Sequence, residues 1–86
     1  MNGPVPEPTE IQERICRFLA ARCHVPLDEL SGDTRFEEDL GLDSFDLVEL
    51  LIEVEDAYGV VITDAEATLI HSISDAAALI ASRTPG

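Results

Sequence analysis

Apolar residues recur at helical spacing near the start of the chain. Ile11, Ile15, Phe18 and Leu19 place apolar side chains on one face of a helix. Thr9 and Gln12 have the spacing of a capping box, in which two side chains satisfy backbone groups at a helix start. The pattern predicts a first helix over about residues 10–23, with its apolar stripe facing the core.

Three further helices are indicated in the second half of the chain. An apolar and acidic pattern begins at Ser44, runs for 15 residues and ends before Gly59, a residue that suits a helix C-terminus. Thr63 and Glu66 repeat the capping-box spacing and predict a short helix over about 64–69. A last helix is predicted from near residue 74, with Asp75 in its first turn and Arg83 in its last.

The segment between the first two helices, residues 24–43, reads as a long loop because Pro26, Gly32 and Gly41 interrupt it. Regular apolar positions within it favour an ordered loop anchored to the core. The expected anchors are Val25, Leu27, Leu30, Phe36, Leu40 and Leu42.

The ends of the chain are rich in proline and glycine, so residues 1–8 and 84–86 are predicted to be flexible tails around one domain of residues 9–83. No strand pattern is evident. We therefore predict an all-α fold, a small antiparallel helical bundle of three main helices and one short helix.

The predicted second helix, residues 44–58, has three faces instead of the usual two. One is the core stripe, which consists of Leu47, Leu50, Leu51, Val54 and Tyr58. A second apolar sector lies away from it, and an acidic sector adjoins that one. These two sectors are a candidate docking surface for a partner protein, made of Phe45, Val48 and Ile52 with Asp46, Glu49, Glu53 and Asp56.

Charge supports a protein partner. The chain has 18 acidic residues, five arginines and no lysine, and its net charge of -13 excludes ordinary binding to a nucleic-acid backbone. Between Arg35 and Arg83 there are 12 acidic residues and no lysine or arginine. Basic protein surfaces are the natural partners. The alternative is that the acids only solvate one face and that Phe45, Val48 and Ile52 cover the long loop.

Other classes of function find little support. Four aromatic residues argue against a large substrate cavity. Cys16, Cys23, His24 and His71 lack metal-site spacing, and residues 39–43 do not fit a calcium-binding EF-hand loop, so no metal is expected. No stretch has the length of a membrane span or the pattern of a signal peptide, and a cytoplasmic monomer is the expectation.

Ser44 is the candidate site of chemistry. Asp43 is the better N-cap, because its carboxylate can accept a hydrogen bond from the first turn, and Ser44 then takes the first helical position with its hydroxyl free. Backbone N–H groups and the helix dipole favour a phosphate ester there. The alternative is that Ser44 is itself the cap.

The run Asp39-Leu40-Gly41-Leu42-Asp43-Ser44 closely resembles the attachment motif of acyl carrier proteins, and the resemblance extends over about residues 9–83. It implies that Ser44, with Asp43 as part of the motif, receives 4′-phosphopantetheine from coenzyme A through a phosphopantetheinyl transferase. The arm's thiol would hold acyl groups as thioesters, and the acidic second helix would be recognised by acyl-loading, synthase or transferase enzymes with basic docking surfaces. The resemblance implies a carrier and not an enzyme.

Several residues depart from the family pattern. Phe45 stands where leucine is commonest, residues 41–43 differ from the Gly-Gly-x-Ser pattern of peptidyl carriers, and His71-Ser72 replaces a pair that often contains threonine. A peptidyl carrier is disfavoured, while fatty acid, polyketide and specialised acyl pathways stay open. The competing class is an unmodified acidic helical adaptor that docks basic proteins and uses Ser44 only as a capping residue.

Overall fold

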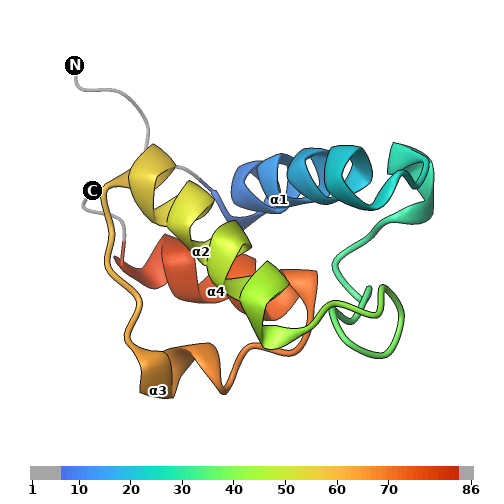
Figure 1. The fold of residues 1–86 in the computed structure, drawn as a ribbon. Coiled ribbons are helices and arrows are strands. Elements are labelled where there is room, and N and C mark those ends of the chain that lie inside the picture. Colours follow the sequence, from blue (N-terminus) through green and yellow to red (C-terminus); the bar gives the residue numbers. More distant parts are fainter. Residues whose placement is uncertain (1–6, 84–86) are drawn as a thin grey trace.

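A computed structural model describes residues 7–83, so residues 1–6 of the tail predicted over 1–8, and the predicted tail at 84–86, lie outside the described residues. The elements are α1 (Pro8–Cys23), a 3₁₀ turn η1 (Leu27–Glu29), α2 (Ser44–Tyr58), α3 (Asp64–Ala67) and α4 (Ile73–Arg83). In Figure 1, α1 runs in one direction and α2 and α4 run in the other. The predicted all-α bundle of three main helices and one short helix is confirmed.

The start of α1 differs from the prediction. Glu7 is the N-cap and makes no side-chain capping bond, and Pro8 is the first helical residue. The predicted capping box of Thr9 and Gln12 is wrong, because both residues lie within the helix. Proline suits the first position because its ring fixes φ at a helical value. An N–H group at this position would have no acceptor within the helix, so its absence in proline loses no hydrogen bond.

The two short connections around α3 also differ in detail. α3 ends at Ala67, two residues before the predicted end, and the chain continues in tighter turns in which Leu69 and Ile70 donate to carbonyls three residues back. α4 begins at Ile73. Its first turn is closed by Ser72 Oγ, which accepts the N–H of Asp75 at 3.2 Å, while the Asp75 carboxylate accepts the N–H of Ser72 at 3.2 Å. Asp75 thus completes a reciprocal cap that the sequence analysis did not predict.

The core lies between α1, α2 and α4, and α1 packs mainly on α4. The predicted core stripe of α2 is confirmed: Leu50, Leu51 and Val54 are buried, and Leu47 and Tyr58 are partly buried against them. The buried side chains of the core are Ile11, Ile15, Cys16, Leu19, Phe36, Leu42, Leu50, Leu51, Val54, Val60, Ile62, Ile70, Ile73, Ala76, Ala77 and Ile80.

The long loop before α2 is ordered by its contacts with the start of α4. The N–H of Phe36 donates to the carbonyl of His71 at 3.0 Å, and the N–H of Ile73 donates to the carbonyl of Thr34 at 3.0 Å. Phe36 and Leu42 are buried, whereas Leu27, a predicted anchor at the start of η1, is 48% exposed. The remaining predicted anchors, Val25, Leu30 and Leu40, are partly buried. Two buried side chains and the bonds to α4 fix the loop that leads into α2.

Within residues 7–83, no helix combines the length and the apolar character needed to cross a bilayer.

Candidate functional site

Ser44 is exposed and is the first residue of α2. Asp43 precedes it as the N-cap: its Oδ1 accepts the N–H of Asp46 at 2.9 Å, and Asp46 Oδ2 accepts the N–H of Asp43 at 3.4 Å. The predicted capping role of Asp43 is confirmed. Ser44 is therefore not the cap, and its hydroxyl is not used to start the helix.

The loop turns sharply two residues before the cap. Gly41 has φ +66°, a conformation that residues with a Cβ adopt only with strain, and its N–H donates to the carbonyl of Glu37 at 2.9 Å. Leu42 then points into the core and Asp43 faces outward. This turn presents Ser44 to solvent.

The backbone around Ser44 fits a phosphate ester. Of the first four N–H groups of a helix, which lack intrahelical acceptors, those of Asp43 and Asp46 are used by the capping box. The N–H groups of Ser44 and Phe45 have no acceptor within residues 7–83. Two donors and the positive end of the helix dipole are thus available beside the hydroxyl.

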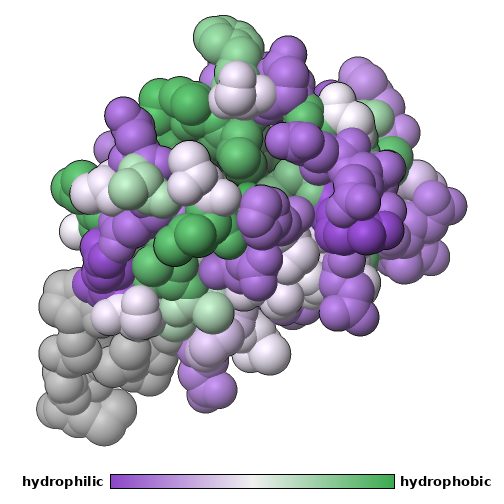
Figure 2. Space-filling view, turned by 90° about the horizontal axis from the view of Figure 1, so that it is seen from below, coloured by the Kyte–Doolittle hydropathy of each residue, from purple (hydrophilic) through white to green (hydrophobic). Residues whose placement is uncertain are grey.

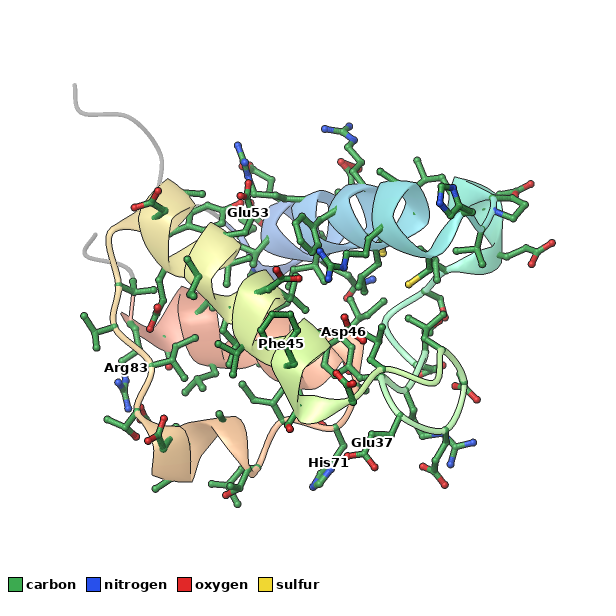
Figure 3. All side chains as sticks on the ribbon, viewed as in Figure 1. Glu37, Phe45, Asp46, Glu53, His71 and Arg83 are labelled. Carbon is green, nitrogen blue, oxygen red and sulfur yellow. The ribbon has the colours of Figure 1, made fainter. Side chains whose placement is uncertain are left out.

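A groove of about 310 Å³ opens beside Ser44, between α2 and the chain from α3 to His71. It is lined by Glu37, Ser44, Leu47, Val48, Leu51, Ala67, Thr68, Ile70 and His71. Figure 3 shows Glu37 and His71 near one another by the first turn of α2. This groove was not predicted from the sequence, because the residues from Ala67 to His71 line it with α2 only in the folded chain and no local spacing signals that return.

The second apolar sector of α2 lies open to solvent. Phe45, Val48 and Ile52 are 67%, 51% and 57% exposed, so the part of the alternative in which they cover the loop is wrong. Phe45 stands clear of the loop in Figure 3. Apolar side chains also form patches between hydrophilic ones on the face seen from below (Figure 2).

The acidic sector is divided into two parts by Arg22, which lies at the end of α1. The guanidinium donates to Asp46 Oδ1 at 3.0 Å and also forms an ion pair with Glu49. Glu53 and Asp56 are exposed and have no ion pair within residues 7–83. All four acids were predicted to share one surface, because nothing in local spacing reveals a partner 24 residues away.

These contacts change the protonation equilibria of the pair. Hydrogen bonding to Asp46 raises the pKa of Arg22, and the same bond, with the N–H of Asp43, lowers the pKa of Asp46. Asp46 therefore stays ionised while it closes the capping box beside Ser44.

The cysteines lie on α1, away from Ser44 in the sequence. Burial raises the pKa of the Cys16 and Cys23 thiols, which keeps them protonated and weakly nucleophilic. In the part of the chain that the structure describes, no group of three or more His, Cys, Asp and Glu side chains could hold a metal ion.

These features define a class of protein: a small helical domain that presents one serine at the entrance of a surface helix. A family profile described as a phosphopantetheine attachment site matches residues 13–80. Two acyl carrier proteins of Rickettsia bellii are each 38% identical over 65 residues. That of strain RML369-C is aligned over 76% of both chains, and that of strain OSU 85-389 over 76% of this chain and 80% of its own.

The fold has a close counterpart among solved structures. The acyl carrier protein from Enterococcus faecalis superposes with a TM-score of 0.78, covering 91% of this chain and 99% of that one, at 23% identity. The chain belongs to the acyl carrier protein family, whose members carry a covalent 4′-phosphopantetheine group and are carriers, not catalysts. Membership implies interaction with a phosphopantetheinyl transferase and with acyl-processing enzymes.

Proposed function

We propose that Ser44 carries 4′-phosphopantetheine and that the chain holds acyl intermediates on this arm for fatty acid, polyketide or related specialised acyl synthesis. The observation that supports this best is the exposed hydroxyl of Ser44 at the first position of α2, left free by the Asp43 cap. The arm supplies a thiol on which acyl groups are held as thioesters.

Ser44 is a substrate in the attachment reaction. Its Oγ forms a bond to the phosphorus of coenzyme A that bears the pantetheine, the pyrophosphate bond breaks, and adenosine 3′,5′-bisphosphate leaves. The hydroxyl proton passes to a base of the transferase. The N–H groups of Ser44 and Phe45 then lie beside the new phosphodiester.

Acidic residues surround the reacting hydroxyl. Asp43 and Asp46 lie in the capping box, and Glu37 lines the adjoining groove. Their charge repels an incoming pyrophosphate, so the transferase must supply Mg²⁺ and basic groups.

The groove beside Ser44 is the proposed resting place for part of the arm or its cargo. Leu47, Val48, Leu51 and Ile70 give it an apolar wall, and its volume of about 310 Å³ is at the small end of ligand pockets. Thr68 and His71 add polar groups at the wall. A short acyl chain, or the end of the arm, fits a groove of this size and lining.

Partner enzymes are proposed to dock on the exposed face of α2. Phe45, Val48 and Ile52 supply apolar contact, and the neighbouring acids Asp46, Glu49, Glu53 and Asp56 attract basic surfaces. We place this function in the cytoplasm and assign it to a monomer.

The test is incubation with coenzyme A and a broad-specificity phosphopantetheinyl transferase, followed by mass spectrometry of the intact protein. The wild type should gain one phosphopantetheine group, and Ser44→Ala should gain none. Ser31→Ala is the matched control, because Ser31 is an exposed serine in the loop and should not affect modification. An unmodified wild type would contradict the proposal and leave the unmodified acidic adaptor as the alternative. A modified Ser44→Ala would contradict Ser44 as the attachment site.

A further inference from the structure

Arg22 joins α1 to the candidate docking surface at two points. Its guanidinium holds Asp46 Oδ1 at 3.0 Å and pairs with Glu49, one turn further along α2. All three side chains are only partly exposed. Two of the four acids expected to meet a basic partner already have a positive partner inside the domain.

A second groove of about 310 Å³ lies over this ion pair. It is lined by Phe18, Arg22, Glu49, Ile52 and Glu53, so residues of α1 and of the α2 docking surface meet in it. A cation that enters the groove meets the positive charge of Arg22 as well as the negative charges of Glu49 and Glu53. Arg22 therefore weakens the attraction of this end of the surface for a basic side chain.

The other two acids of the surface face solvent. Glu53 and Asp56 are exposed and lie toward the C-terminal half of α2, where no arginine is paired with them within residues 7–83. In Figure 3, Asp46 lies at the N-terminal end of α2 and Glu53 lies further along the helix. The surface is thus uneven in charge along its length.

We propose that Arg22 is a specificity-determining residue, which holds Asp46 and Glu49 within the domain and leaves Glu53 and Asp56 as the acids that a basic partner meets first. The inference rests on the proposed function of α2 as the docking surface. Arg22 in α1 thus determines which part of that surface attracts partners. A partner that binds Glu49 must displace Arg22.

The test is a double-mutant comparison with a broad-specificity phosphopantetheinyl transferase as the partner. The dissociation constant of the complex between the chain and the transferase is measured by fluorescence anisotropy, without coenzyme A and at low salt. Glu49→Gln is compared with its parent in two backgrounds, the wild type and Arg22→Gln. We expect Glu49→Gln to weaken binding less than about twofold in the wild type and about three- to fivefold with Arg22→Gln, the range of an exposed charge pair. Arg22→Gln alone should tighten binding and steepen its salt dependence.

Two controls separate charge competition from a structural role. Asp56→Asn should weaken binding equally in both backgrounds, because Asp56 has no ion pair with Arg22 and does not line the groove that Arg22 lines. Arg22→Lys keeps the charge and should keep the effect of Glu49→Gln small. An equal effect of Glu49→Gln in both backgrounds would overturn the proposal about Arg22. A wild type that binds the transferase but is not modified at Ser44 would instead contradict the attachment site.

Discussion

At the N-terminus of α2, one carboxylate closes the helix and leaves the next hydroxyl free. Asp43 Oδ1 accepts the N–H of Asp46 at 2.9 Å. Asp43→Ala should lower the free energy of unfolding by about 1 kcal/mol, the usual loss for a capping residue, because one first-turn N–H loses its acceptor. Urea unfolding followed by circular dichroism measures this change.

Asp43→Asn is the matched control for the cap. Asparagine has a side-chain oxygen that accepts the same N–H, so most of the stability should return. If Asp43→Ala and Asp43→Asn were equally destabilised, the capping bond would not be the source of the effect.

Asp46 gives a pH-dependent prediction. In the folded protein, hydrogen bonds from Arg22 and from the N–H of Asp43 lower the pKa of Asp46 below its ordinary value of 3.8. The ionised form of Asp46 therefore stabilises the fold. This contribution is fully present above the unfolded pKa and is lost as pH falls through the lower folded pKa. The wild type should therefore be more stable than Asp46→Asn at pH 6, and the difference should shrink below about pH 4.

Measuring both proteins at each pH removes the effects of the other acids, which both share. Thermal unfolding at pH values from 6 to 3 gives the comparison. A difference that stayed constant down to pH 3 would show that the charge of Asp46 does not stabilise the fold.

How far sequence predicts a residue's role depends on how far away its partners lie. The caps of α2 and α3 join residues three positions apart, so spacing alone identified Asp43 with Asp46 and Thr63 with Glu66. Arg22 and Asp46 are 24 positions apart, and only the packing of α1 on α2 brings them together. Pro8 was predicted to lie in the N-terminal tail, but it is the first residue of α1. Proline is common both in flexible segments and at the first position of a helix, so its presence alone does not distinguish the two.

At the scale of elements, two phenylalanines on either side of the α2 entrance have opposite environments. Phe36 in the loop is 1% exposed, and Phe45 in α2 is 67% exposed. Phe36→Ala should cost about 3–5 kcal/mol because it empties a core position and frees the loop. Phe45→Ala should change stability by no more than about 0.5 kcal/mol.

The same two variants separate folding from docking. Phe45→Ala should weaken association with a phosphopantetheinyl transferase although its unfolding curve is unchanged, because its ring supplies apolar contact on the proposed surface. Unfolding curves and binding constants measured on both variants check this. A strongly destabilised Phe45→Ala would mean that its ring packs within the domain.

The helices could be predicted because apolar residues recur at helical spacing within each segment. The surfaces formed between the helices could not be predicted in this way. Leu47 and Leu51 belong to the core stripe by spacing, yet they also line the groove beside Ser44. The other wall comes from Ala67 to His71, after the chain has turned through α3. A groove made by a return of the chain has no signature in either segment alone.

At the scale of the whole molecule, negative charge is far from balanced. Each of the five arginines has an intramolecular partner: Arg14 lies over the Tyr58 ring, and the others pair as Arg17 with Glu13, Arg22 with Asp46 and Glu49, Arg35 with Glu38 and Asp39, and Arg83 with Glu66. With 18 acidic residues against these five, repulsion remains over the surface. The chain therefore offers negative charge to partners at a cost in its own stability.

Salt should consequently stabilise the domain. Screening weakens both the repulsion and the ion pairs, but the repulsion involves many more charges, so the midpoint of thermal unfolding should rise as NaCl increases from about 0.01 M to 0.5 M. The double variant Glu53→Gln, Asp56→Asn removes two exposed acids without breaking an ion pair within residues 7–83. It should unfold at a higher temperature than the wild type at low salt and gain less from added NaCl. A midpoint that fell with salt would show that the arginine pairs outweigh the repulsion, and the acidic surface would then carry no cost for the fold.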